Sequence, residues 1–110
     1  LCPIYFERKS IPDLFGTLTA GHKRFKAELT RAKDLNVRIV LAIEGTIRDI
    51  LQGSEYSTVS GDTILKKLMT LWLRYDLTPM FFRTREEMAR AITEFYLAFG
   101  RNYKTKGKIQ

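Results

Sequence analysis

Three apolar segments of the chain have the length and composition of β-strands. The clearest is 37–43, which is apolar on both faces beyond Arg38. A strand of this kind lies in the middle of a sheet whose two faces are covered by helices. Residues 1–6 and 77–82 are further runs rich in β-forming residues, so we expect them to form the other strands.

Between these segments the apolar residues recur at the spacing of an α-helix. The spacing predicts helices over residues 10–18, 22–34, 46–51, 62–75 and 84–99, with a break at 19–21 and a surface loop at 52–60. Ser10 and Asp62 are the expected N-caps, and Thr84–Glu87 has the form of a capping box. Gly100 is the expected end of the last helix. The resulting order, βααβααβα, predicts a single α/β domain.

Length and composition exclude several classes of protein. With 110 residues, of which 45% are hydrophobic and 28% charged, the chain can form one globular domain with its own core. The single cysteine, Cys2, excludes an internal disulfide framework and a multi-cysteine zinc site. No apolar run approaches the roughly 18 residues that span a membrane. We therefore expect an intracellular protein, in the nucleus if the source is eukaryotic and otherwise in the cytoplasm, with no membrane partner and no organic cofactor.

The excess positive charge lies at the two ends of the chain. The formal net charge is +7; residues 1–34 contribute +3, residues 35–100 are neutral, and residues 101–110 contribute +4. Such an excess favours an anionic partner, with nucleic acid first. Five basic residues of the second helix are the expected phosphate contacts: Lys23, Arg24, Lys26, Arg31 and Lys33. Lys26 and Lys33 are seven residues apart and share a helix face, so we expect contact with the nucleic-acid backbone and no reading of base edges.

A carboxylate and an ammonium group lie two residues apart where the first strand ends. Alternation along a strand places Glu7 and Lys9 on one face and Arg8 on the other. The carboxylate can hold Mg²⁺, which prefers oxygen ligands, and the lysine can offset the negative charge that builds on a phosphoryl group. The pair suits metal-dependent cleavage of phosphodiesters, but a solvated ion pair at the end of a strand has the same sequence.

The context of this pair resembles one family. Residues 7–13, E-R-K-S-I-P-D, have the form E-R-K-x-x-x-D, which is similar to the signature of the XPF-type structure-specific DNA endonucleases, a branch of the PD-(D/E)XK nucleases. Residues 21–25, G-H-K-R-F, resemble the family's Gly-Arg-Phe/Leu segment, and residues 40–45 resemble its central apolar strand, which ends in an acid. The family also has a Gly-Asp pair about one strand earlier, whereas only six residues precede Glu7 and none is acidic.

The resemblance implies a fold and an activity. The fold is restriction-endonuclease-like, a mixed sheet flanked by helices, with the nuclease domain at 1–103, lacking its first strand or strands, and a basic tail at 104–110. The activity is cleavage of branched DNA, such as flaps, forks or Holliday-type junctions, in repair or recombination, with Mg²⁺ or Mn²⁺. The alternative is a catalytically inactive pseudonuclease that serves as a DNA-binding or dimerisation partner.

The resemblance also implies roles for individual residues. Glu7, Arg8, Lys9 and Asp13 form the catalytic set, and Arg24 reaches toward the substrate. Glu7 is the expected metal ligand, with a further Asp upstream of Leu1 and Glu44 as another candidate. From the residues alone, Asp13 could instead be the acid of a capping box, or serve both purposes, and Glu44 could be a solvated strand end.

Family nuclease domains associate in pairs, so the resemblance further implies a homodimer or heterodimer. We expect Trp72, Phe95, Tyr96 and Phe99 to lie mostly in the core. Their helices, at 62–75 and 88–99, carry many large apolar groups, and we expect them to be neighbours that could share a dimer face. A specific interface of this kind should bury at least roughly 1,000 Å².

Overall fold

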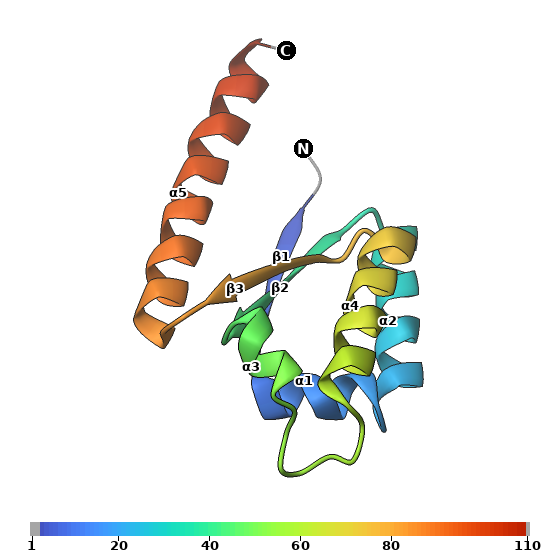
Figure 1. The fold of residues 1–110 in the computed structure, drawn as a ribbon. Coiled ribbons are helices and arrows are strands. Elements are labelled where there is room, and N and C mark those ends of the chain that lie inside the picture. Colours follow the sequence, from blue (N-terminus) through green and yellow to red (C-terminus); the bar gives the residue numbers. More distant parts are fainter. Residues whose placement is uncertain (1–2, 110) are drawn as a thin grey trace.

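The computed structural model describes the backbone of residues 3–109 and the side chains of residues 3–102. Its elements are β1 (Ile4–Ser10), α1 (Ile11–Leu18), α2 (His22–Asp34), β2 (Arg38–Glu44), α3 (Ile47–Leu51), α4 (Gly61–Tyr75), β3 (Thr78–Phe82) and α5 (Arg85–Ile109) (Figure 1). This is the succession of strands and helices that the hydrophobic pattern predicts. The predicted tail at 104–110 lies outside the residues whose side chains are described.

The three strands form one parallel sheet in the order β1-β2-β3. The expectation of a mixed sheet is therefore wrong for the strands that the structure describes. Two helices separate each strand from the next, and such a crossover returns the chain to the same end of the sheet, which makes the neighbouring strands parallel. Parallel strands also end at a common edge, and at that edge Ser10 lies opposite Glu44 and Glu44 opposite Phe82.

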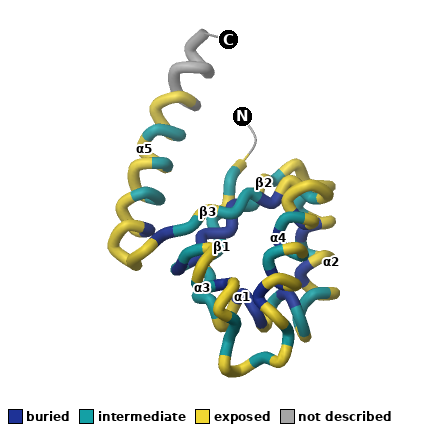
Figure 2. The backbone as a smooth tube through the Cα atoms, in the orientation of Figure 1, coloured by how far each residue is buried: buried dark blue, intermediate teal, exposed yellow. Residues whose placement is uncertain are grey.

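The sheet separates two apolar clusters of unequal size. The main core lies on the side of α1, α2 and α4 and includes Leu41 and Ile43 of β2. The smaller cluster lies on the other side, where Ala42 of β2 packs with Met88 of α5. Figure 2 shows the buried residues concentrated in the sheet and in the helices beside it, and few along α5.

The helices α4 and α5 consequently lie on opposite sides of the sheet and are not neighbours (Figure 1). The expectation that α4 and α5 are neighbours, on which a shared dimer face depended, is therefore wrong. Trp72 and Tyr96, which we expected mostly in the core, are 48% and 44% exposed. The reason is that a helix on a small sheet buries one stripe only, and on α4 this stripe is formed by other residues, such as Leu68.

Side-chain caps begin several of the helices. Ser10 caps α1 as predicted, and its hydroxyl accepts a hydrogen bond from the backbone N–H of Asp13. The cap of α4 is Ser60 and not the predicted Asp62, which lies within the first turn. A hydroxyl and a carboxylate two residues apart both suit a helix start, since acids also favour the first turn. The sequence alone did not separate these two positions.

The last helix is longer than expected because it continues through Gly100 to Ile109. Glycine disfavours a helix by only about 1 kcal/mol, so it ends one only where the following residues favour another conformation. Near its middle, α5 is held to β1 by the edge-to-face contact of Phe95 with Phe6 and by the Tyr96 hydroxyl, which donates to the carbonyl of Ile4 at 3.1 Å. Within the described part of the chain, no helix has the length and apolar character needed to cross a membrane.

Candidate active site

The E-R-K motif lies inside β1 and not after it. The strand, Ile4–Ser10, pairs with β2 along its whole length, and Lys9 lies opposite Ile43 of the main core. The side chains of Glu7 and Lys9 therefore point to the side of the sheet that α1 and α2 cover, and Arg8 points to the α5 side, as alternation along a strand predicts. Glu7 and Lys9 are both partly buried.

The side chains of Glu7 and Lys9 line a hollow of about 400 Å³ between β1, α1 and α2, which we call the β1–α2 hollow. It is lined by Glu7, Lys9, Pro12, Asp13, Gly16, Thr17, Gly21, Arg24, Phe25 and Glu28. Three members of the predicted catalytic set, Glu7, Lys9 and Asp13, thus border one concave surface. The residue expected to reach toward the substrate, Arg24, borders the same surface.

Asp13 reaches this hollow because α1 begins directly after β1. The Ser10 hydroxyl fixes the start of the helix, accepting at 3.2 Å from the N–H of Asp13. Asp13 is then the third residue of α1, in the first turn, and its side chain remains beside the strand end from which the helix departs. Side chains on a helix are inclined toward its N-terminus, which favours this position.

The carboxyl group of Glu7 is in an environment that disfavours its charge. Burial is the main cause and raises the pKa of Glu7 above its usual value of 4.5; the nearby charge of Glu28 raises it further, while the ammonium group of Lys9 lowers it. The single positive neighbour therefore does not compensate for burial. A carboxylate in this condition gains from an additional cation, such as a metal ion.

Glu28 is a part of this site that the sequence reasoning missed. It lies on α2 four residues after Arg24, and both line the β1–α2 hollow. Residues four apart share a face of a helix, so once Arg24 is placed at a site, the same spacing indicates Glu28. The hollow therefore contains three carboxylates, those of Glu7, Asp13 and Glu28, and two cationic groups.

A second hollow, of about 260 Å³, adjoins the strand end on the α5 side. It is lined by Arg8, Lys9, Ser10, Asp13, Glu44, Arg85 and Met88. Glu44 forms an ion pair with Arg85, with 3.5 Å between Nε and Oε2. Lys9 and Asp13 border both hollows, whereas Arg8 and Glu44 border only this one. Arg8 and Glu44 are therefore separate from the β1–α2 hollow that contains Glu7.

The five basic residues of α2 do not form one continuous row. Arg24 lines the β1–α2 hollow, while Lys26 lines a pocket between α2 and α4. The Lys33 ammonium donates to the backbone carbonyl of Arg74 on α4 at 3.4 Å, which places it on the same side as Lys26. All five are exposed; Lys23 and Arg31 line neither hollow nor pocket. Helix α2 thus presents positive charge on two of its sides.

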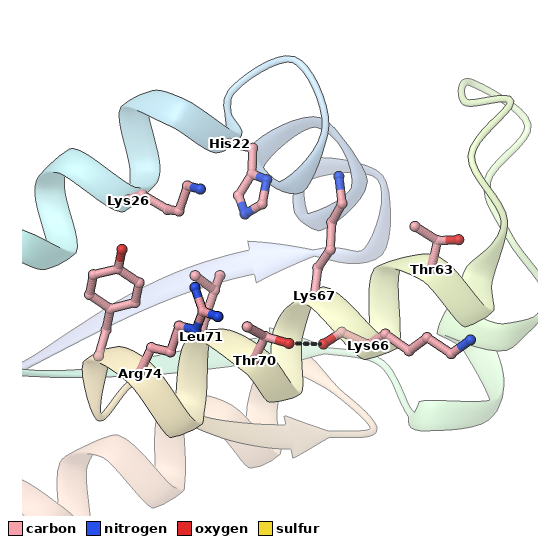
Figure 3. A pocket seen from close by; sticks show the side chains of 9 residues that line it. His22, Lys26, Thr63, Lys66, Lys67, Thr70, Leu71 and Arg74 are labelled. Atoms are coloured by element: carbon pink, nitrogen blue, oxygen red, sulfur yellow. Dashed lines mark hydrogen bonds between the residues drawn. The ribbon is translucent and has the colours of Figure 1, made fainter.

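The pocket between α2 and α4, which we call the α2–α4 pocket, has a volume of about 230 Å³. It is lined by His22, Lys26, Thr63, Lys66, Lys67, Thr70, Leu71, Arg74 and Tyr75. In Figure 3, His22 extends from α2 and Lys67 from α4 into the space between the helices. Burial lowers the pKa of His22, and the charges of Lys67 and Lys26 lower it further.

The carboxylates of the β1–α2 hollow offer a partial set of metal ligands. Within the described residues, no three ligating side chains of His, Cys, Asp or Glu gather closely enough to hold a metal ion. Mg²⁺, however, keeps several waters and commonly takes only one or two protein carboxylates together with substrate phosphates. The partly buried carboxylate of Glu7, whose charge is poorly compensated, fits such a role.

Comparison with known proteins relates this geometry to a family. The family model described as the ERCC4 domain matches residues 2–95. This range includes the E-R-K-x-x-x-D motif, the whole sheet and the first half of α5. No curated protein matches the chain.

Proposed function

Because the chain belongs to the ERCC4 domain family, that of the XPF-type nuclease domains, we propose that it is the nuclease domain of an endonuclease that hydrolyses phosphodiester bonds in branched DNA. The observation that carries this proposal is the β1–α2 hollow, in which Glu7, Lys9 and Asp13 meet from two different elements. Flaps, forks and Holliday-type junctions are the proposed substrates, in repair or recombination. An enzyme of this kind acts where chromosomal DNA lies, in the nucleus of a eukaryote or otherwise in the cytoplasm.

The residues of the hollow can each perform one part of phosphodiester hydrolysis. Glu7 would hold a divalent ion, Mg²⁺ or Mn²⁺, which when bound would polarise the phosphoryl group and lower the pKa of a water molecule. Lys9, on the same face of β1, donates hydrogen bonds to the phosphate oxygens and offsets the charge that grows on them as water attacks phosphorus. Asp13 orients the water or a ligand, and Arg24 holds the DNA backbone beside the hollow.

Arg8 has a supporting role in this proposal. Its side chain lies on the α5 side of the sheet, in the hollow that also contains Glu44 and Arg85. Arg8 and Arg85 line this hollow with the single carboxylate of Glu44, besides Lys9 and Asp13, which border both hollows. The charge at the strand end therefore stays positive. We therefore propose that Arg8 positions Glu44 and the end of β1.

The alternative is a pseudonuclease that binds DNA or a partner domain without cutting. The observation that favours it is that no three metal-ligating side chains gather within the described residues. The two proposals differ in their response to divalent metal, since binding to DNA phosphates by lysine and arginine needs no metal ion, whereas hydrolysis does.

The test measures cleavage and binding of the same labelled branched DNA. A protein containing this chain is incubated with a fork substrate in Mg²⁺, Mn²⁺ or EDTA, and binding is measured in EDTA. Glu7→Gln and Lys9→Ala should reduce cleavage by at least about a hundredfold, as removal of groups that stabilise the transition state does, and should leave binding nearly unchanged. Glu55→Gln and Arg48→Ala are the matched controls, because both residues are exposed and border neither hollow.

The outcomes separate the proposals. Loss of cleavage in the Glu7 and Lys9 variants alone supports the nuclease. Cleavage at the wild-type rate by both variants would show that the site is elsewhere. Binding without metal-dependent cleavage by the wild-type protein would support the pseudonuclease.

A further inference from the structure

The α2–α4 pocket carries an unusual concentration of positive charge. Lys26 from α2 and Lys66, Lys67 and Arg74 from α4 line it together with His22, and none of the described residues that line it carries a carboxylate. The ion pairs of Arg85 with Glu44 and of Arg90 with Glu94 lie outside the pocket, and within the described residues neither involves any of these four cations. The four cations of the pocket therefore have no carboxylate partner within the described part of the chain.

Such an arrangement is unfavourable unless an anion enters. Like charges gathered on one concave surface repel one another, and a wall of low polarity strengthens the effect. The pocket has such a wall in part, since Leu71, which lines it, is buried. Lys67 is partly buried, and its ammonium group donates to the carbonyl of Leu18 at 2.8 Å. The neighbouring Lys26, Lys66 and Arg74 are exposed to solvent, where an anion can reach them.

The size and chemistry of the pocket favour a phosphate group as the anion. At about 230 Å³ the pocket is smaller than the roughly 300–1,000 Å³ of sites for organic ligands. Arginine offers a planar pair of donors that matches a phosphate, and lysine adds point charges. The Thr63 hydroxyl, which lies 3.0 Å from the Ser60 hydroxyl, can add a hydrogen bond to an anion, whereas the Thr70 hydroxyl donates to the carbonyl of Lys66 at 2.9 Å (Figure 3).

We propose that the α2–α4 pocket is a second phosphate site, which holds a backbone phosphate of the nucleic acid on the side of α2 opposite the β1–α2 hollow. The proposal rests on the proposed function, because it assumes that the anion belongs to DNA. Helix α2 forms a wall of both sites, through Arg24 on one side and Lys26 on the other. A helix with its side chains is about 10–12 Å across, and a duplex carries one charge per about 1.7 Å of its axis, so one duplex can supply phosphates to both sites.

The experiment removes one positive charge from each wall of the pocket. Lys26→Gln with Arg74→Gln removes two exposed cations without removing the Lys67 hydrogen bond. Arg48→Gln with Arg83→Gln is the control of equal charge, since both residues are exposed, lie outside the pocket and take part in neither of the two ion pairs named above. Duplex DNA affinity is measured in EDTA across a range of salt concentrations. In parallel, NMR follows the protonation of His22, the only histidine, with and without inorganic phosphate or a short duplex.

The pocket variant should flatten the log–log dependence of affinity on salt by up to about 1.8, because each phosphate that is no longer neutralised reduces the slope by about 0.9. When the salt concentration rises from about 50 to 200 mM, both proteins lose affinity for DNA. The loss should be smaller for the variant, by a factor of up to about 12. The His22 pKa should rise when the duplex binds the wild-type protein, and this rise should shrink in the variant. The groups that face His22 are Lys26 on its own helix and Lys66, Lys67, Arg74 and Tyr75 on α4.

Three results overturn the proposal. If the pocket variant and the control have the same salt dependence, the pocket does not contact DNA. If inorganic phosphate shifts the His22 pKa while the duplex does not, the pocket takes phosphate from another source. If neither probe shifts the pKa, the pocket binds no phosphate. Failure of metal-dependent cleavage would instead count against the proposed nuclease, because all these measurements are made without metal.

Discussion

The start of α4 has a glycine that allows close contact with α3. A Cβ atom built on Gly61 would lie 2.7 Å from Cα of Leu51 and 2.9 Å from the carbonyl carbon of Ile50, and closer still to the Ile50 oxygen. These are backbone atoms, which cannot turn aside as the end of a flexible side chain can. We therefore predict that Gly61→Ala forces α3 and α4 apart.

The magnitude follows from the contact and from helix propensity. Alanine favours a helix over glycine by up to about 1 kcal/mol, while forcing extra atoms into a packed contact costs about 1–3 kcal/mol and occasionally more. Because the clash is with backbone atoms, the cost lies at the upper end of this range, and subtracting the helix term leaves a net decrease of about 2 kcal/mol in the free energy of unfolding. For a domain of this size each kcal/mol shifts the melting temperature by roughly 4–8 °C.

The matched control is Gly100→Ala, in the middle of α5. A Cβ atom there meets nothing within 4 Å, so the substitution should stabilise the protein by about 0.5–1 kcal/mol. Urea unfolding followed by circular dichroism gives both values. The same substitution is thus expected to act with opposite signs at the two positions.

The result also concerns the α2–α4 pocket. Gly61 sets how closely α4 approaches α3, and α4 supplies one wall of that pocket. If Gly61→Ala were as stable as the wild type, the close contact between α3 and α4 would be wrong, and with it the position of the start of α4 beside the pocket.

Three further predictions concern the site and the surface. Burial raises the pKa of Glu7, so the contribution of this group to stability is fully present below about pH 4.5 and is lost as the pH rises through the raised pKa. At pH 7, Glu7→Gln should therefore resist urea better than the wild type. An equal or lower stability of the variant would refute the burial of the Glu7 carboxyl group. Lys23→Gln and Arg24→Gln should weaken binding to all DNA sequences about equally and each flatten the salt dependence by up to about 0.9, whereas loss of binding to one sequence alone would indicate base contacts. The wild-type protein should sediment as a dimer. Because α4 and α5 lie on opposite sides of the sheet, only one of the variants Leu73→Glu on α4 and Leu97→Glu on α5, at positions 85% and 53% exposed, should produce a monomer, and it identifies the interface. A wild-type monomer at high concentration would contradict this prediction.

Much of the fold follows from local sequence because local physics determines it. The buried strand β2 is recognisable from its apolar run, and α2 begins and ends as its apolar spacing predicts. The side of the sheet on which α5 lies depends on contacts between distant segments, such as Phe6 with Phe95, and for this reason the expectation that α4 and α5 are neighbours failed. The mixed sheet was implied by the resemblance, whereas the helical crossovers of the predicted element order by themselves favour the parallel strands that the structure shows.

The difference between local structure and contacts between distant segments also explains which parts of the candidate site could be predicted. Glu7, Lys9 and Asp13 lie within seven residues of one another, on a strand and the helix that follows it, so strand alternation and a helix cap suffice to bring them together. Glu28 required the orientation of α2 against β1, although its spacing from Arg24 gave a usable signal.

The α2–α4 pocket required the packing of helices about forty residues apart in the chain. Lys66, Lys67 and Arg74 lie in the electrically neutral middle of the sequence, where counting charges gave no sign of a basic surface. The fold gathers these cations beside His22 and Lys26 in a pocket whose described lining carries no carboxylate. Net charge along the sequence therefore underestimates how much of this domain can face a polyanion, since α2 balances Arg24 with Glu28 at the β1–α2 hollow and contributes to a wholly basic surface only where α4 packs beside it.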